Sequence, residues 1–228
     1  MVEGHPAQPA PTGIAVVAVD EHLVVLNKPA HLLSVPGKGP AGADCLSARV
    51  QAVYPDALVV HRLDMGTSGL MVMARGPAHQ RTLSQAFAHR QTHKRYEAVV
   101  AGLVDGTPLE TDAEGWHHID LPLITDWPNR PRSKVCHEHG KPSLTRWRVL
   151  GPGPLPDTTR VWLEPVTGRS HQLRVHMLAL GHPMVGDGLY ACGPALAGAD
   201  RLLLHAAQLS LPHPVTGERM QWNAPTPF

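Results

Sequence analysis

The sequence predicts an α+β domain, and three observations support this prediction. Short apolar runs rich in β-branched residues recur along the chain, whereas few segments have the spacing of an amphipathic helix. Strands and helices do not alternate regularly, which disfavours a parallel βαβ sheet. The length of 228 residues suits one domain with a sizeable core. We expect a Pro- and Ala-rich flexible tail at residues 1–13 and one folded domain over residues 14–228.

The strands are predicted from their β-branched content and from the turn residues between them. Asp20-Glu21-His22 separates the first two runs and predicts an opening hairpin. Residues 102–142 hold many Pro, Asp and Gly residues and are expected to be mostly loop. In chain order, strands are expected at residues 14–19, 23–28, 59–60, 70–74, 96–101, 144–150, 160–165, 202–211 and 220–222.

Helices are predicted where a suitable first residue precedes apolar residues at helical spacing. Asp44 is a suitable N-cap for a short helix. Pro77 at a first helical position begins a helix that runs to about Arg90. Ser170 is expected to cap a third helix through Leu180, after which a Gly and a Pro end it.

Composition excludes some classes of protein. The three cysteines are far apart and form no CxxC pair, which argues against a disulfide framework or a zinc ribbon and fits a reducing cytoplasm. Sixteen histidines are present, but none has the spacing of a metal motif. The apolar runs are too short to cross a membrane. The net charge of +1 does not by itself indicate a nucleic-acid partner.

Two clusters of cations stand out from this balanced charge. One comprises Arg90, Lys94 and Arg95; the other comprises Arg130, Arg132 and Lys134. Either cluster alone is most often a solvated face.

The most informative segment is His61-Arg62-Leu63-Asp64-Met65-Gly66-Thr67-Ser68-Gly69. It places the basic residue Arg62 two residues before the acidic residue Asp64, in a polar turn between apolar strands. Its small residues allow a substrate to approach the backbone closely. An isolated Asp in a turn most often accepts local N–H groups, so the segment alone leaves a structural role open.

This segment resembles the HRLDxxTSG signature of the RluA-type pseudouridine synthases. Further blocks resemble that family in the same order and span residues 25–228, nearly the whole chain. One block can arise by chance, but six in order indicate the family. The other five blocks are Lys28-Pro29 with residues 33–36, residues 94–98 (KRYEA), residues 168–176 (GRSHQLRVH), residues 181–190, and a closing block of residues 204–206 with Ala224-Pro225.

The resemblance implies a mixed, mostly antiparallel central sheet with flanking helices and a central active-site cleft. It also implies an isomerase that detaches uracil from C1′ of a uridine, rotates it and rejoins it through C5. This chemistry has no redox, phosphoryl-transfer or hydrolytic step, so we expect neither a cofactor nor a metal.

Three catalytic residues are implied by the resemblance. Asp64 is the catalytic carboxylate; whether it attacks the base, attacks the sugar or removes a sugar proton stays open. Arg174 is the cation that keeps Asp64 ionised in a dry pocket. Tyr96 stacks on the flipped uracil, although a half-buried strand aromatic is the plainer interpretation.

Further residues are expected to contact RNA. By resemblance, Arg62 enters the stem where the target base has left, which offsets part of the unstacking cost. Leu173 packs beside the tyrosine and is also a plausible core residue. His171 and Gln172 of the same motif are expected at the RNA side.

Residues 126–136 (DWPNRPRSKVC) resemble a stretch of one subgroup, the dual-specificity synthases acting on 23S rRNA and tRNA. Trp127, Arg130, Arg132 and Lys134 suit base stacking and phosphate contact, whereas the plainer interpretation is an irregular surface loop. That subgroup lacks an S4 RNA-binding domain, and we expect none here. The expected partners are stem-loops of 23S rRNA and tRNA, with no membrane and no obligatory protein partner.

Three alternatives remain from the sequence. The first alternative is a single-substrate synthase of the same family, and the second is a noncatalytic RNA-binding factor in ribosome assembly. The third is an RNA-modifying enzyme that uses Cys136 beside His137. The second has no use for a buried carboxylate, and the third lacks a Gly-rich cofactor loop. Serine-hydrolase and P-loop motifs are absent.

Overall fold

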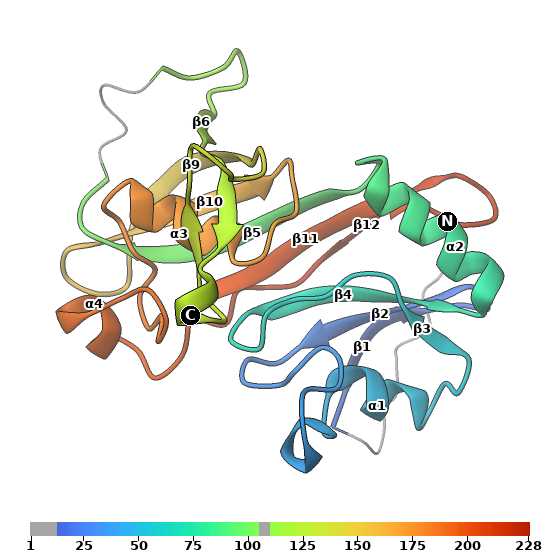
Figure 1. Cartoon of the computed structure of the whole chain (residues 1–228). Helices are drawn as coiled ribbons and strands as arrows, with labels where there is room; N and C mark the ends of the chain where they lie inside the picture. The colour runs from blue at the N-terminus through green and yellow to red at the C-terminus, as the bar shows by residue number, and fades with distance from the viewer. Residues whose placement is uncertain (1–12, 105–109) are drawn as a thin grey trace. The chain divides into compact units, whose positions relative to one another are not determined.

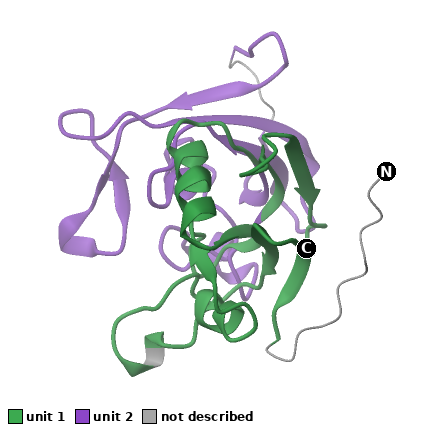
Figure 2. Ribbon diagram, turned by 90° about the vertical axis from the view of Figure 1, so that its right-hand side faces the viewer, with its two compact units in different colours: residues 1–94, 206–226 green, residues 95–205, 227–228 purple. Residues whose placement is uncertain are grey.

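The computed structural model describes residues 13–104 and 110–228 (Figure 1). These residues form two compact units, coloured separately in Figure 2: residues up to 94 with 206–226, and residues 95–205 with 227–228. The chain passes between the units within strands β5 (His93–Ala101) and β11 (Leu204–Pro212) rather than through a linker. The tail expected at residues 1–13 lies, except for Gly13, outside the described residues.

In the first unit, neighbouring strands follow the order β1-β2-β4-β11. Strand β3 pairs with β4 and β12 pairs with β11. Leu83 of helix α2 is fully buried in a core with residues of β2, β4 and β11, which explains why this helix packs on the sheet. The bounds are β1 Ala15–Val19, β2 Leu23–Lys28, the 3-10 turn η1 Pro40–Gly42, α1 Leu46–Gln51, β3 Ala57–Val59, β4 Ser68–Arg75, α2 Pro77–Ala88 and β12 Arg219–Asn223.

Gly69, the last residue of the 61–69 segment, is required by the close approach of two strands. Its φ of 108° lies in a region that favours glycine, and a Cβ built there would lie 2.4 Å from the carbonyl oxygen of Ala206 in β11. A residue with a side chain therefore does not fit at this position, directly after the turn that contains Asp64.

In the second unit, the strand order is β5-β10-β9-β6, with antiparallel pairing throughout. Strands β7 and β8 form a separate two-stranded hairpin. Trp147 of β9 is 1% exposed and is among the largest fully buried side chains of the described residues. The bounds are β6 His117–Asp120, β7 Leu123–Thr125, the 3-10 turn η2 Trp127–Asn129, β8 Ser133–Val135, β9 Leu144–Pro152, β10 Thr158–Pro165, α3 Gln172–Ala179 and α4 Gly193–Ala197.

The opening hairpin, the helix that begins at Pro77 and most of the strands are confirmed. Two predicted caps are wrong. Asp44 is not the N-cap of α1; Cys45 is, and the Asp44 carboxylate pairs with Arg49 instead. Ser170 does not cap α3, which is preceded by His171 in a left-handed conformation with φ of 56°. The stretch expected to be mostly loop also contains the short strands β6, β7 and β8.

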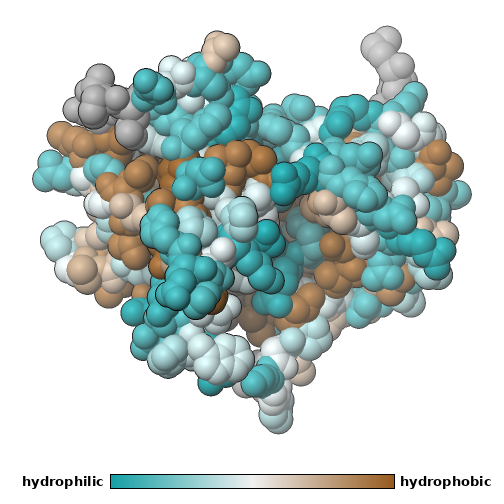
Figure 3. All heavy atoms as spheres, turned by 45° about the horizontal axis from the view of Figure 1, so that its top comes forward, coloured by the Kyte–Doolittle hydropathy of each residue, from teal (hydrophilic) through white to brown (hydrophobic). Residues whose placement is uncertain are grey.

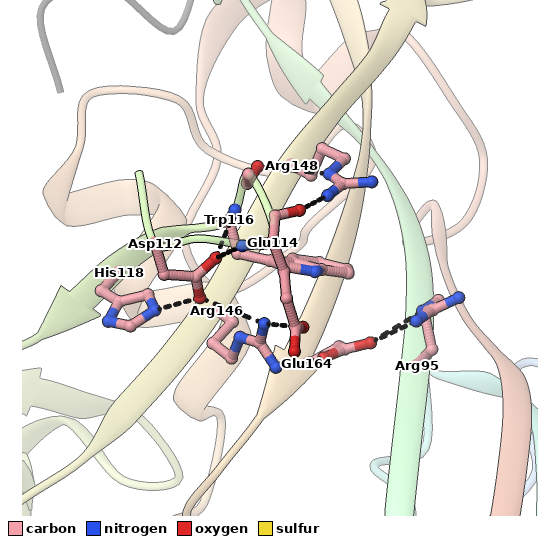
Figure 4. Close-up of polar contacts among 9 residues, drawn as sticks. Arg95, Asp112, Glu114, Trp116, His118, Arg146, Arg148 and Glu164 are labelled. Atoms are coloured by element: carbon pink, nitrogen blue, oxygen red, sulfur yellow. Dashed lines mark hydrogen bonds and ion pairs between the residues drawn. The ribbon is translucent and has the colours of Figure 1, made fainter. Parts of the chain in front are cut away.

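The first cation cluster is not a simple solvated face, because Arg95 belongs to a charge-balanced network (Figure 4). Arg95 pairs with Glu164 at 2.7 Å and lies over the rings of Trp116 and Trp162. Arg146 binds the carboxylates of Glu164, Glu114 and Asp112. We therefore assign this network to the stability of the β9–β10 sheet face rather than to RNA.

The surface matches the balanced composition. Hydrophilic residues cover much of the face shown in Figure 3, with hydrophobic patches among them. Among the described helices, none has the length and apolar character that crossing a membrane requires.

Candidate active site

The Asp64 turn is held through its backbone. Ser34 Oγ donates to the Leu63 carbonyl at 2.7 Å and accepts the Leu63 N–H at 3.1 Å. The Thr67 N–H closes the turn on the Asp64 carbonyl at 3.1 Å. Leu63 is buried, whereas Asp64 is half-buried and Arg62 is exposed. The sequence thus places a carboxylate beside solvent on a backbone that is fixed from both sides.

Lys28 fixes the next residue of the turn and was not predicted as a site residue. Its side chain is fully buried, and Nζ donates to the carbonyls of Pro29, Leu32 and Met65 at 2.8, 2.7 and 3.2 Å. A buried ammonium requires such partners, because leaving it without them is costly. In the sequence, Lys28 stands at the end of an apolar strand and in the block Lys28-Pro29, but neither feature indicates that it binds the Met65 carbonyl.

His61 is a structural residue of the same segment. Its Nε2 accepts the Val72 N–H at 3.0 Å, and its ring stacks on Phe87 at 4.4 Å between centroids. Burial, assisted by the charge of Lys94, lowers the pKa of His61 to about 3. The imidazole is therefore neutral at physiological pH, with its proton on Nδ1.

We expect this burial to make stability depend on pH. The pKa of His61 falls from 6.5 in the unfolded chain to about 3 in the folded protein, so unfolding takes up a proton below pH 6.5. The contribution is complete above that pH and is lost as the pH falls towards 3. Between pH 7 and pH 5 the loss from this group is about 2 kcal/mol.

Chemical denaturation at pH 7 and pH 5 measures this effect. His61→Asn should reduce the difference in unfolding free energy between the two pH values, whereas His139→Asn, at an exposed histidine, should not. Equal pH dependence in all three proteins would contradict the assignment.

Tyr96, Leu173 and Arg174 all lie in the second unit. Tyr96 is on β5 and pairs with Leu163 of β10; it is 9% exposed. Leu173 and Arg174 are in the first turn of α3 and are 7% and 6% exposed. Their burial matches groups that line a dry site, and for Leu173 it equally matches a core role.

The guanidinium of Arg174 is held by Asp187. Its Nε donates to Oδ2 at 2.7 Å and its Nη2 donates to Oδ1 at 2.6 Å, in a bidentate pair. The Asp187 side chain is fully buried and also accepts the N–H groups of Leu189 and Tyr190. Two donor groups of Arg174 thus bind the carboxylate of Asp187, which fixes the plane of the guanidinium.

Asp187 is positioned by a tightly packed segment. Gly186 has φ of 71°, and a Cβ there would lie 1.9 Å from the carbonyl oxygen of Arg201. The Val185 N–H binds the Val99 carbonyl of β5. In the sequence, Gly186-Asp187 is visible only as part of a motif, and nothing there indicates that Asp187 binds Arg174.

His171 and Gln172 differ in their surroundings. Gln172 is 3% exposed; its Oε1 accepts from Thr167 and Arg169, and its Nε2 donates to Leu144 and Thr145. This amide holds the turn before α3 on β9, and the expected contact of Gln172 with RNA stays a prediction. His171 is half-buried and is paired with the hydroxyl of Tyr190 at 2.7 Å.

Strands β7 and β8 form a hairpin over residues 123–135, and residues 126–132 are its ordered tip. The 126–136 stretch is therefore not an irregular loop. Trp127 is 67% exposed, and the Arg130 guanidinium lies over its ring at 4.0 Å. Asp126 binds Asn129 and Lys134, and these contacts lower the pKa of its carboxyl. Arg130 and Arg132 are exposed, whereas part of the charge of Lys134 is balanced by Asp126.

The structure therefore gathers the expected residues in two places. Arg62 and Asp64 lie in the first unit, and Tyr96, His171, Leu173 and Arg174 lie in the second with the hairpin. Over residues 13–104 and 110–228, no three His, Cys, Asp or Glu side chains are grouped so as to hold a metal ion.

Comparison with known proteins identifies the family. The family model for RNA pseudouridylate synthase matches residues 22–179. The chain belongs to this family, and it is an isomerase that acts on RNA.

Relatives with known names agree. The chain is 49% identical over 215 residues to the Dual-specificity RNA pseudouridine synthase RluA of Escherichia coli (strain K12), covering 94% of both chains. It is 52% identical over 202 residues to the protein of that name from Vibrio vulnificus, covering 87% of this chain and 78% of the relative. A solved structure of human RNA Pseudouridylate Synthase Domain Containing 1 is 28% identical with a TM-score of 0.78, covering 97% and 87% of the two chains.

Proposed function

We propose that the enzyme converts uridine to pseudouridine in hairpins of both 23S rRNA and tRNA, with Asp64 as its catalytic carboxylate. The observation that carries the catalytic part is the Asp64 turn, whose backbone is held by Ser34 and Lys28 while the carboxylate itself stays half-buried. A group placed so firmly contributes more to the transition state than a mobile one.

The reaction is an isomerisation in which atoms balance within the nucleotide. The bond from C1′ to N1 breaks, a bond from C1′ to C5 forms, and the hydrogen of C5 leaves as a proton while N1 gains one. Asp64 acts on the target nucleotide, and Arg174 is the second charged catalytic residue. Tyr96 stacks on the uracil while the base is detached, and Arg62 fills the space that the base leaves in the stem.

Dual specificity is supported by the names of two relatives and by the form of the hairpin tip. The relatives from Escherichia coli and Vibrio vulnificus are named for it. Trp127 and the exposed Arg130 and Arg132 provide one stacking surface with adjacent cations. Such a surface recognises the shape of an RNA loop that both RNAs share, and it does not require a long common sequence. Unpaired loop bases can be splayed out at low cost and stacked on an aromatic side chain. We place this reaction in the cytoplasm.

Three short RNAs test the choice of substrate: a tRNA anticodon stem-loop, a matching 23S rRNA hairpin, and a stem-loop with a scrambled loop. We expect pseudouridine at one uridine in each natural hairpin and none in the scrambled one, measured by mapping after incubation with enzyme. Modification of only one natural hairpin would refute dual specificity and leave the synthase activity intact. It would also favour the single-substrate alternative.

Arg130→Ala with Arg132→Ala should weaken RNA binding and reduce its salt dependence. Each lost phosphate contact should lower the slope of log affinity against log salt by ~0.7–0.9. Titrations of a stem-loop at several salt concentrations measure the slope. Arg49→Ala with Arg81→Ala removes the same charge elsewhere and should leave the slope unchanged. If the two double variants behave alike, the hairpin tip is only a solvated surface.

A further inference from the structure

Tyr190 connects the hairpin to the buried Arg174. Its hydroxyl oxygen accepts the backbone N–H of Ser133, in strand β8, at 2.7 Å. Its ring lies under the guanidinium of Arg174, with Cζ 4.9 Å from the ring centroid. One side chain therefore contacts both a strand of the hairpin and the cation proposed to act on Asp64.

The backbone N–H of Ser133, which donates to Tyr190, takes no part in the hydrogen bonds between β7 and β8. Ser133 is opposite Thr125 at the end of the β7–β8 ladder, and the next bond on the tip side runs from the Asp126 N–H to the Arg132 carbonyl. The Ser133 N–H consequently points out of the ladder, and the residue is only 7% exposed. A buried N–H needs a partner, and the phenol oxygen supplies it.

The other end of Tyr190 is fixed by the same groups that fix Arg174. Asp187 accepts the Tyr190 N–H while it holds the guanidinium. His171, which precedes α3, is paired with the phenol at 2.7 Å. A phenol oxygen has one donor and two acceptor positions, so it can serve Ser133 and His171 together.

We propose that Tyr190 is a positioning residue that holds the 123–135 hairpin in register with Arg174, so that RNA bound at the hairpin tip is presented to the catalytic groups. This inference rests on the proposed RNA contact of Arg130 and Arg132. In this proposal Tyr190 acts through the Ser133 peptide, and not on the RNA or the reacting atoms directly.

Tyr190→Phe removes the hydroxyl and leaves the ring beneath Arg174. We expect KM for a stem-loop to rise about tenfold, with kcat changed less than about threefold. Exchange of the Ser133 amide hydrogen should accelerate at least about tenfold, because its partner is gone. Tyr54→Phe, in the first unit, is the matched control and should change none of these quantities.

The change is then repeated on Arg130→Ala with Arg132→Ala. If Tyr190 acts through the hairpin, Tyr190→Phe should raise KM less than about twofold in this background, since the contacts that it positions are already missing. A tenfold rise there, a loss confined to kcat, or unchanged Ser133 exchange would overturn the proposal. If the arginine variants alone leave KM unchanged, the proposed RNA contact fails, and Ser133 exchange separately shows whether the hydroxyl holds the hairpin.

Discussion

Asp64→Asn is expected to reduce the rate of pseudouridine formation by at least about 1,000-fold, while RNA affinity changes only a few-fold. A factor of this size corresponds to ~4 kcal/mol of transition-state stabilisation. The amide is nearly the same size but carries no charge and is neither a nucleophile nor a base. Because the backbone of the turn is held by Ser34 and Lys28, the substitution should leave the fold unchanged. Single-turnover rates and binding titrations on one stem-loop separate the two effects.

Two control variants test whether the loss of activity is specific to the Asp64 carboxylate. Asp44→Asn removes a carboxylate of the same unit that pairs with Arg49 at the surface, and it should retain full activity. Cys136→Ala should also retain activity, because the sulfur is not needed for the isomerisation. An inactive Cys136→Ala together with an active Asp64→Asn would revive a thiol mechanism.

Asp187→Asn should have the second largest effect, because it removes the buried negative charge that pairs with the guanidinium of Arg174. Removing one partner of a buried ion pair costs about 3–5 kcal/mol of stability. The Asn oxygen can still accept a hydrogen bond, but its NH₂ group faces the guanidinium. We expect the free energy of unfolding to fall by about 3 kcal/mol, and turnover at a temperature where the variant is folded to fall about 100-fold.

Asp56→Asn is the matched control for this prediction. It removes an ion pair with Arg75 whose side chains are 45% and 26% exposed, and such pairs contribute less than about 1 kcal/mol. Denaturation and single-turnover rates are measured on both variants. Full activity in folded Asp187→Asn would show that the orientation of Arg174 is irrelevant to the reaction.

Most of the fold could be predicted because its strands carry strong local signals. Strands β2 and β4 are nearly continuous apolar runs, and α2 begins at a proline. Strands β7 and β8 were missed because each has three residues and pairs with the other in Pro-rich sequence. The division into two units was also invisible, since the chain crosses between them inside strands and leaves no compositional break.

The residues proposed for catalysis and the residues that position them all lie in motifs, but the motifs do not show which groups the positioning residues bind. Asp64 and Arg174 belong to recognisable blocks. The Nζ of Lys28 reaches the Met65 carbonyl 37 residues away, and Tyr190 binds Ser133 57 residues away. Such partners depend on the folded path of the chain. The predicted caps failed for a local reason: a suitable residue type was present, but its side chain found another partner or none.

Release of tritium from the C5 position of uridine tests the central claim most directly. Forming the bond from C1′ to C5 requires loss of the C5 hydrogen, whereas binding alone leaves it in place. A hairpin labelled at C5 of its uridines should release one equivalent of tritium with the wild-type protein, at the rate at which pseudouridine appears, and none with Asp64→Asn. Tight RNA binding by the wild-type protein without tritium release, or equal release by Asp64→Asn, would contradict the account.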